Sequence, residues 1–247
     1  MIISSKNTLE YILHRNGEKF SSKYDRIIGK NIEGNRNAPG FIKTFGNSNI
    51  KAFTGFIDLH NYTKQTFGYK SNEMAVYLNG FLRNVINILS NFGAMIDKMI
   101  GDEIMFIIPE IEENKSPIEI LRLGQLLGTL YDYANKNENG YKFRVGLSYG
   151  LINVFHLEGD NYSEWSSVGE SVNIAKRLHS LPVMKNPDPI CGAFGLSGNI
   201  DDQKLTEQKL KYYLEFIAGY ASKYKTSDYP HKSVLNGIGT VIYGTFC

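Results

Sequence analysis

The spacing of apolar positions predicts alternating strands and helices along the middle of the chain. An apolar run over residues 50–59 predicts a buried strand, and residues 71–91 repeat apolar side chains at helical spacing. Residues 95–107 are apolar on both sides of Gly101 and Asp102, which is typical of a β-hairpin with a tight turn. A strand, a long helix and a hairpin are therefore expected in that order.

The same kind of pattern continues after the hairpin. Ser116, Pro117 and Glu119 predict the start of a second amphipathic helix, because Ser and Glu three residues apart form a capping box. Alternation over residues 141–151 predicts another strand. The resulting β-α-β-β-α-β order is the ferredoxin-like arrangement, with helices on one face of an antiparallel sheet, so the expected fold class is α+β.

The remainder of the chain predicts extensions of this core. A helix is expected to begin at Gly169, and residues 182–200, rich in Pro and Gly, are expected to form a loop. Residues 202–225 predict an amphipathic helix, and residues 234–246 predict one closing strand. The chain is thus expected to have three parts: an N-terminal helix and basic loop (1–49), a core (50–181), and a C-terminal loop, helix and strand of the same domain (182–247).

Composition limits the classes of function. The 247 residues are 42% hydrophobic and 21% charged, which suits a globular core, and the net charge of +2 is too small to indicate nucleic acid as the partner. No apolar run is long enough to span a membrane, and no secretory signal begins the chain. Cys191 and Cys247 are too few for a disulfide framework, so we expect a cytoplasmic protein. Six basic residues within residues 15–36 predict either a solvated face or a phosphate contact.

Two pairs of polar residues are candidates for chemistry. Asp58 follows the first apolar strand and Asp102 lies at the hairpin apex. If those strands are neighbours, the two carboxylates lie side by side and favour a divalent cation; the alternative is that each acid merely ends a strand and faces water. Asn173 and Arg177 are four residues apart and share a helical face, which suits a phosphorylated sugar, unless they are surface residues without a role.

Four segments, covering about residues 53–181, together resemble the catalytic domain of class III nucleotide cyclases. That resemblance implies conversion of a nucleoside triphosphate to a 3′,5′-cyclic monophosphate and pyrophosphate on a ferredoxin-like core. The matching segments are the strand 56–58, the Lys-x-x-Gly-Asp hairpin 98–102, the Arg-hydrophobic-Gly-hydrophobic-x-x-Gly strand 144–150, and the Gly-x-x-Val-Asn-x-Ala-x-Arg-Leu helix within 168–178.

The resemblance also implies a role for each matching residue. Asp58 and Asp102, joined by the carbonyl of Leu59, would hold two divalent cations, Mn²⁺ or Mg²⁺. Asn173 would orient the ribose, and Arg177 would stabilise charge that develops on the α-phosphate. Because the family draws the metal aspartates from one protomer and the Asn and Arg from the other, a homodimer with active sites at the interface is expected.

Phosphate and base recognition follow from the same resemblance. Backbone N–H groups near Tyr62 and Thr63 would bind the terminal phosphates. Lys98 and Ser166 occupy the positions that read the base, and the Glu and Cys of guanylate cyclases are absent, which disfavours GTP. Since Lys98 only donates hydrogen bonds, it suits adenine N1 or uracil O4 and suits cytosine less well.

Residues 61–63 depart from the usual Gly-Phe-Thr, and the chain shows no sensor domain or membrane anchor. In these respects it resembles the pyrimidine cyclases of bacterial antiphage signalling. UTP is therefore the first-choice substrate, with cyclic UMP acting on a separate effector. The alternatives are a bacterial adenylate cyclase that makes cyclic AMP, a catalytically silent nucleotide-binding module, and another two-metal enzyme of the palm type.

Overall fold

The computed structural model describes residues 48–110, 117–136, 140–160, 162–181, 187, 189–196, 203–221, 231–235 and 238–247. The expected N-terminal helix, the basic segment within residues 15–36 and the capping residue Ser116 lie outside the described residues. The strands and helices expected from residue 50 onward can be compared with the structure.

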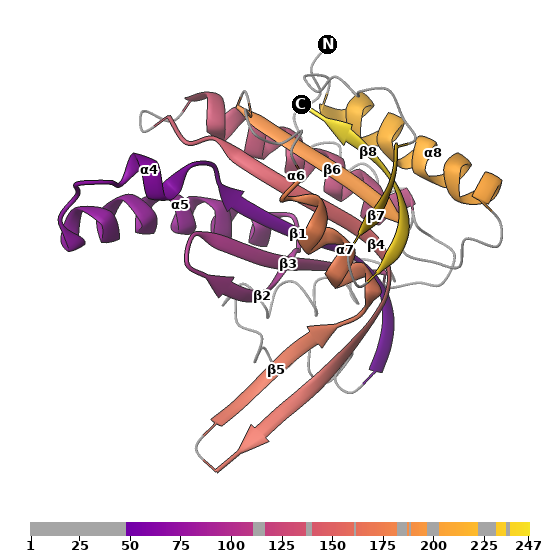
Figure 1. Cartoon of the computed structure of the whole chain (residues 1–247), viewed down its shortest axis with the longest axis horizontal. Coiled ribbons are helices and arrows are strands. Elements are labelled where there is room, and N and C mark those ends of the chain that lie inside the picture. The colour runs from indigo at the N-terminus through magenta and orange to yellow at the C-terminus, as the bar shows by residue number, and fades with distance from the viewer. Residues whose placement is uncertain are drawn as a thin grey trace, which may run out of the picture.

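Strands and helices alternate through the described residues (Figure 1). None of the described helices is long and apolar enough to cross a membrane. The helices are α4 (Tyr62–Gln65), α5 (Ser71–Asn91), α6 (Pro117–Lys136), α7 (Glu170–Leu178) and α8 (Gln203–Ala221). The strands are β1 (Ser48–Leu59), β2 (Met95–Ile100), β3 (Glu103–Pro109), β4 (Phe143–Gly159), β5 (Tyr162–Val168), β6 (Ile190–Leu196), β7 (His231–Leu235) and β8 (Gly239–Phe246).

One sheet joins these strands: seven follow the order β2-β3-β1-β4-β6-β8-β7, and β5 pairs with β4 off this path. Its pairs are antiparallel except for β4 and β6, which run parallel. The first four strands, with α5 and α6, form the ferredoxin-like βαββαβ core, so the predicted α+β class is confirmed. The far half of β4 pairs with β5, and the two form a hairpin that projects from the body (Figure 1).

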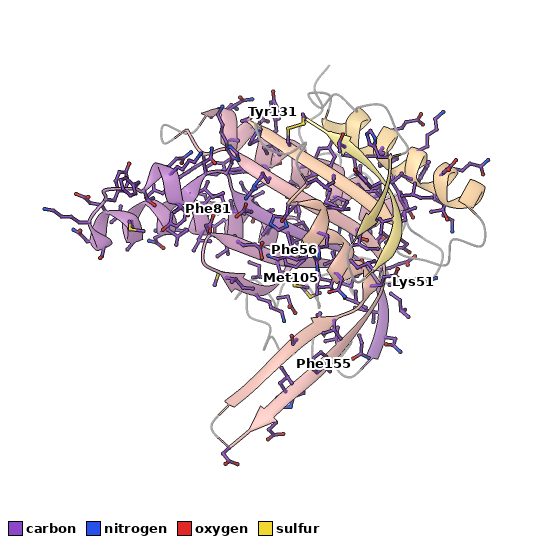
Figure 2. The ribbon with its side chains drawn as sticks, in the orientation of Figure 1. Lys51, Phe56, Phe81, Met105, Tyr131 and Phe155 are labelled. Atoms are coloured by element: carbon purple, nitrogen blue, oxygen red, sulfur yellow. A yellow bond between two sulfur atoms is a disulfide. The ribbon has the colours of Figure 1, made fainter. Side chains whose placement is uncertain are left out.

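Helices cover both faces of the sheet. On one face α5, α6 and α8 enclose the largest apolar cluster, in which Phe53, Phe81 and Phe194 are fully buried. On the other face the single helix α7 packs against β1, β4 and β6. A smaller cluster forms there around Phe56 and Met105, which are cross-strand partners and lie next to each other in Figure 2. The prediction that helices cover one face holds for the core helices, and α7 is the addition that covers the second face.

Helix α5 begins and ends with recognisable signals. The backbone N–H of Lys70 donates to Glu73 Oε2 at 2.8 Å, so the cap lies at Lys70 and Ser71 is already helical. Gly93, with φ of 69°, ends the helix in the left-handed conformation that glycine adopts at little cost.

Three parts of the C-terminal half were predicted wrongly or missed. Residues 182–200 are not simply loop, because β6 lies between β4 and β8 in the sheet. The glycines of β6 are typical of a loop, so the sequence did not indicate a strand. In the structure Gly192 leaves room for the ring of Phe246, which would lie 2.1 Å from an added Cβ. The expected closing strand is two strands, β7 and β8, and β5 had not been anticipated.

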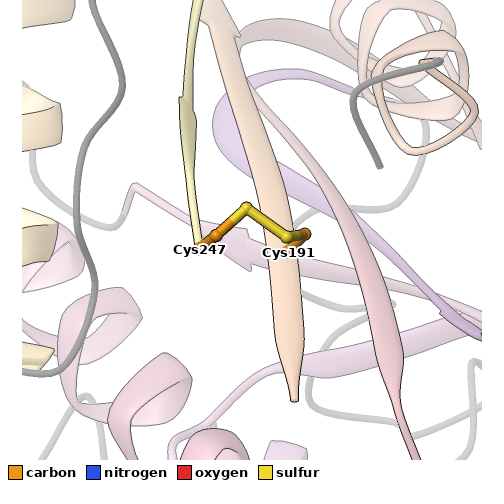
Figure 3. The surroundings of a disulfide bond; sticks show 2 residues. All are labelled: Cys191 and Cys247. Carbon is orange, nitrogen blue, oxygen red and sulfur yellow. A yellow bond between two sulfur atoms is a disulfide. The ribbon is translucent and has the colours of Figure 1, made fainter. Parts of the chain in front are cut away.

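The two cysteines are joined, contrary to the expectation drawn from their number. Cys191 on β6 and Cys247 after β8 form a disulfide, with their Cα atoms 4.3 Å apart (Figure 3). The sheet brings them together because their neighbours Gly192 and Phe246 are cross-strand partners. Pairing of residues 56 positions apart follows from the order of the strands and cannot be deduced from a count of cysteines.

Helix α7 sits directly on the backbone of β4. A Cβ atom at Gly146 would lie 2.1 Å from the carbonyl oxygen of Ala175 and 2.5 Å from the backbone nitrogen of His179. Both obstacles are backbone atoms, which cannot rotate away as a side chain can. The absence of a side chain at this position therefore sets how closely α7 approaches the sheet.

Replacing Gly146 by Ala should force α7 away from β4. We expect Gly146→Ala to lower the free energy of unfolding by about 3 kcal/mol, the upper end of the usual cost of overpacking. Gly140→Ala is the comparison, because no atom lies within 4 Å of a Cβ added at Gly140 and only the φ of +64° opposes a side chain there. We expect that strain to cost about 1 kcal/mol of the free energy of unfolding. Urea denaturation measures both, and equal losses would contradict the close approach of α7.

Candidate active site

A group of charged side chains lies on the α7 face of the sheet. Asp58, one residue before the end of β1, has Glu103 of β3 and Arg144 of β4 as its cross-strand partners. Residues opposite each other on paired strands point to the same face. The strand order β3-β1-β4 therefore gathers two acids and one guanidinium in one place.

Asp58 and Asp102 are brought together as the sequence predicted. Asp102 lies in the turn between β2 and β3, half-buried. Burial, and then the negative charge of Asp58, raise the pKa of Asp102 to about 6. Asp58 is only 7% exposed, so the alternative that it faces water is wrong.

Arg144 begins one of the four matching segments, but the sequence analysis gave it no role in the site. Its guanidinium forms an ion pair with the Asp58 carboxylate from the neighbouring strand. A partly buried carboxylate is costly unless a cation or hydrogen-bond donors compensate it. The available signal was a charged motif residue at the start of an otherwise apolar strand.

The donor set suits a divalent cation. The side chains of Asp58 and Asp102 and the carbonyl of Leu59, the last residue of β1, offer oxygen ligands of the kind that Mg²⁺ and Mn²⁺ prefer. Burial and then the charge of Asp58 raise the pKa of Asp102, and a cation would relieve both effects by favouring the ionised carboxyl. In the part of the chain that the structure describes, no three His, Cys, Asp or Glu side chains cluster as a metal site. The group therefore fits a cation that also takes water or substrate oxygens as ligands.

The loop after β1 turns sharply into α4. Asn61 has φ of 58°, in the left-handed region, and among the described residues it is alone in this outside glycine. Asn tolerates that conformation better than most residues, so it can occupy a position where glycine would otherwise be favoured. The turn places Tyr62 and Thr63 in the first turn of α4, and Tyr62 stacks on Tyr77 with ring centroids 6.4 Å apart.

The predicted base-reading residues are in contact. Lys98 Nζ on β2 donates a hydrogen bond of 2.6 Å to Ser166 Oγ on β5. A bulge makes this possible: Ile96 pairs with Phe106 and Lys98 with Met105, so Asp97 is an extra residue in β2. The bulge turns Lys98 to the same face as Met105, the face on which α7 lies.

Asp97 lies next to the Lys98–Ser166 pair and contacts Lys98 and the neighbour of Ser166. It is 6% exposed, accepts a hydrogen bond of 3.0 Å from Ser167 Oγ, and lies 3.7 Å from Lys98 Nζ. Ser166 is 3% exposed. The ammonium of Lys98 is thus held between a hydroxyl and a carboxylate, with its position fixed by two strands.

Asn173 and Arg177 lie together on α7, one turn apart. Both are exposed, and neither makes a side-chain hydrogen bond or ion pair with any residue that the structure describes. Among the described residues, neither forms a hydrogen bond or ion pair with Asp58 or Asp102. The structure therefore contains two groups of predicted residues, one on the sheet and one on α7, that no such bond joins within the chain.

Comparison with known proteins identifies the fold. No protein-family model matches the chain. A stretch of 142 residues, 55% of the chain, is 25% identical to the terminal-differentiation specific adenylate cyclase of Dictyostelium discoideum and spans only 7% of that protein. The adenylyl cyclase CyaB from P. aeruginosa matches with a TM-score of 0.59 and 16% identity, over 81% of this chain and 95% of that chain. The guanylate cyclase domain of RhGC from Catenaria anguillulae, solved in complex with GTP, matches with a TM-score of 0.59 and 17% identity, over 81% and 98% of the two chains.

The chain therefore has the fold of the class III nucleotide cyclase catalytic domain, a mixed α+β fold with a mostly antiparallel sheet. At these identities the solved structures establish the fold, and the chemistry must be argued from the site itself.

Asp102 should make the stability of the folded chain depend on pH. Its pKa is about 6 in the folded chain against an ordinary value of 3.8. At low pH the carboxyl is neutral in both states, whereas above about pH 6 the folded chain must accept a charge that burial and Asp58 oppose, so stability falls as pH rises. Without divalent ions, the melting temperature of Asp102→Asn minus that of wild type should grow from about pH 4 to about pH 7 and then level off.

Glu158→Gln is the control for this titration. Its side chain on the projecting hairpin is 78% exposed, so its effect should be small at every pH. A difference between Asp102→Asn and wild type that does not change with pH would contradict the raised pKa of Asp102.

Proposed function

We propose that this protein is a nucleotide cyclase that converts a nucleoside triphosphate to a 3′,5′-cyclic monophosphate and pyrophosphate. The observation that carries the proposal is the adjacent pair of carboxylates, Asp58 and Asp102, with the raised pKa of Asp102. Two carboxylates that oppose each other's ionisation are suited to holding divalent cations. The cyclase fold and the adenylate cyclase relative support the same reaction class.

Each group of residues has a part in this reaction. Asp58, Asp102 and the Leu59 carbonyl would hold two Mg²⁺ or Mn²⁺ ions, which when bound supply Lewis-acid polarisation of the α-phosphate and favour ionisation of the 3′-hydroxyl. The backbone N–H groups of Tyr62 and Thr63 would bind the terminal phosphates.

The α7 residues would act on the sugar and on the reacting phosphate. Asn173 would hydrogen-bond the ribose and so hold the 3′-hydroxyl in line with the α-phosphate. Arg177 would donate to the non-bridging oxygens of the α-phosphate as negative charge develops there. Their exposed, unpartnered side chains support this role, because a group already engaged within the chain would have to be released first.

UTP is our first-choice substrate. Lys98, fixed by Ser166 and Asp97, presents N–H donors to a base, and the O4 of uracil is an acceptor. Cyclic UMP would then act on a separate effector in antiphage signalling, as the departures at residues 61–63 suggest. The second candidate is an adenylate cyclase, because N1 of adenine is also an acceptor and the curated relative carries that name.

The reaction is tested by supplying ATP, GTP, CTP and UTP in turn with Mn²⁺ and identifying products by mass spectrometry. We expect cyclic UMP as the main product and its loss, by at least about a hundredfold, in Asp58→Ala and in Asp102→Ala, because each removes a metal ligand. Glu158→Ala, at an exposed acid, should retain wild-type turnover.

Each other outcome has a definite meaning. Cyclic AMP as the main product would make the protein an adenylate cyclase and Lys98 a reader of adenine. Nucleotide binding without any cyclic product would indicate the silent module. Full turnover in both aspartate variants would overturn the metal assignment.

We further propose that the active form is a homodimer whose sites each combine Asp58 and Asp102 of one protomer with Asn173 and Arg177 of its partner. The support is that one chain carries both groups, while no hydrogen bond or ion pair between described residues joins them. A symmetric dimer of identical chains would then contain two complete sites.

Two inactive variants should complement each other if the site is shared in this way. Asp102→Ala and Arg177→Ala are each expected to be inactive alone, but half of the dimers in an equal mixture contain one chain of each kind. Each mixed dimer has one intact site of two, so the mixture should recover about a quarter of wild-type turnover. A mixture of Asp102→Ala with Asp58→Ala is the control and should stay inactive, because both changes fall in the same half of the site. Absence of recovery in the first mixture would show that each site lies within one chain.

A further inference from the structure

A polar cluster, with a buried carboxylate and imidazole and an exposed lysine, joins α7 to the strand that follows Asp102. It consists of Glu103 at the start of β3, and Lys176 and His179 at the end of α7; we call it the Glu103 cluster. Lys176 Nζ donates to both carboxylate oxygens of Glu103, at 2.6 Å to Oε1 and closer to Oε2. His179 Nε2 lies 3.2 Å from Glu103 Oε2. Glu103 is 6% exposed, so its carboxylate depends on these two partners.

The ring of Phe56 contacts both Lys176 and His179 of the Glu103 cluster. Lys176 Nζ lies 5.3 Å from the ring centroid, and the His179 ring stacks on the same ring at 6.2 Å with an interplanar angle of 24°. A cation over an aromatic face and a stacked ring are both favourable, directional contacts. Lys176 and His179 are thus restrained by a carboxylate and by an aromatic ring at once.

The Glu103 cluster is not an efficient way to increase the free energy of unfolding. Burying a carboxylate costs free energy that the partners only offset, and well-packed apolar residues would serve as well or better. Two opposing effects also act on His179: burial lowers the pKa of its imidazole, and the charge of the Glu103 carboxylate raises it. What the cluster adds is a fixed geometry between β3 and α7.

Helix α7 needs such a restraint. It has nine residues, and its apolar side, Ile174, Ala175 and Leu178, rests on β4 and β6. Apolar contact is not directional, so it leaves the helix free to roll or slide by small amounts. A directional contact at the side of the helix removes that freedom.

The restrained residue is next to the residues that the reaction would use. Lys176 is adjacent to Arg177 and three positions after Asn173, so any roll of α7 at Lys176 also moves both of those side chains. At the other end, Glu103 directly follows Asp102 in the chain. The cluster therefore ties the helix that carries Asn173 and Arg177 to the hairpin that carries Asp102.

We propose that Glu103 is a positioning residue of the cyclase site: through Lys176 and His179 it sets the angle at which α7 presents Asn173 and Arg177. This inference rests on the proposed cyclase function for its kinetic consequence. Glu103, Lys176 and His179 lie at positions that the matching motifs leave open, so their role is read from the contacts that they make in this chain.

The test compares Glu103→Gln with wild type. The substitution keeps the size of the side chain and removes its charge. Because a misplacement of about 1 Å at a reacting group costs on the order of a hundredfold in rate, we expect kcat to fall by about ten- to a hundredfold. The KM for the nucleotide and the Mn²⁺ dependence should change little, because Asp58, Asp102 and Lys98 are untouched. Lys176→Met is the second variant and should show the same separation of kcat from KM.

Glu215→Gln on α8 is the matched control. Glu215 also pairs with a lysine, Lys211, at 3.7 Å, but that pair is exposed and α8 lies on the opposite face of the sheet. It should leave kcat unchanged. A fall in kcat as large as that of Glu103→Gln would show that the loss of any such ion pair suffices, which would overturn the proposal.

A double variant separates positioning from a direct role. If Glu103 acts through Asn173 and Arg177, adding Glu103→Gln to the double variant Asn173→Ala/Arg177→Ala should lower its small residual kcat no further, whereas independent effects would multiply. An additional loss of tenfold or more, or a weakened Mn²⁺ dependence in the single variant, would place the effect of Glu103 at Asp102 instead and overturn the proposal.

Hydrogen exchange tests the same inference without any turnover. In Glu103→Gln the backbone amides of residues 174–178 should exchange several-fold faster than in wild type or Glu215→Gln, while the amides of β1 and β4 keep their protection. Unchanged exchange in α7 would overturn the positioning role even if the enzyme is active. If wild type makes no cyclic nucleotide but α7 loosens as expected, the proposed function fails while the link between Glu103 and α7 stands.

Discussion

The placement of β1 between β3 and β4 is the constraint on which the site depends. Hydrogen bonding on both edges puts Asp58 opposite Glu103 on one side and Arg144 on the other, in a register that the buried apolar residues of β1 do not allow to slip. The β2–β3 turn then carries Asp102 to the same end of the sheet. The charged side chains are neighbours because the strands that carry them are paired in the sheet.

Electrostatic compensation on this face follows a consistent pattern. Asp58 lies against Arg144, Glu103 against Lys176 and Asp97 near Lys98, so each buried acid has a cation that comes with it from the same chain. Asp102 differs, because its largest electrostatic neighbour is another acid and its pKa is raised. Among the acids named here, Asp102 is thus the one whose ionisation its surroundings oppose, and it is here that we propose a bound cation.

The α7 face also explains two kinds of sequence signal that look unrelated. Gly146 has no side chain because the backbone of α7 occupies that space, and Lys176 is long and charged because it must reach Glu103 past the same contact. Gly146 and Lys176, the latter at a position that the matching motif leaves open, therefore both help to place a short helix accurately on the sheet. Close packing sets its distance and the polar cluster sets its angle.

Local pattern by itself determined the βαββαβ order, the two core helices, the hairpin with Asp102 at its turn, and the helix with Asn173 and Arg177 on one face. These features depend on periodicity and turn chemistry over a few residues, which the sequence states directly. The resemblance of four segments to one family then assigned those residues a reaction.

Tertiary structure alone decided what depends on contacts between distant segments. The glycines of β6 hide a strand whose packing atoms come from Phe246 and α7, and the same pairing of β6 with β8 joins Cys191 to Cys247. The contact of Lys98 with Ser166, the pairing of Arg144 with Asp58 and the Glu103 cluster each require a partner tens of residues away. No local pattern encodes such partners, because strand order and register arise only when the whole sheet forms.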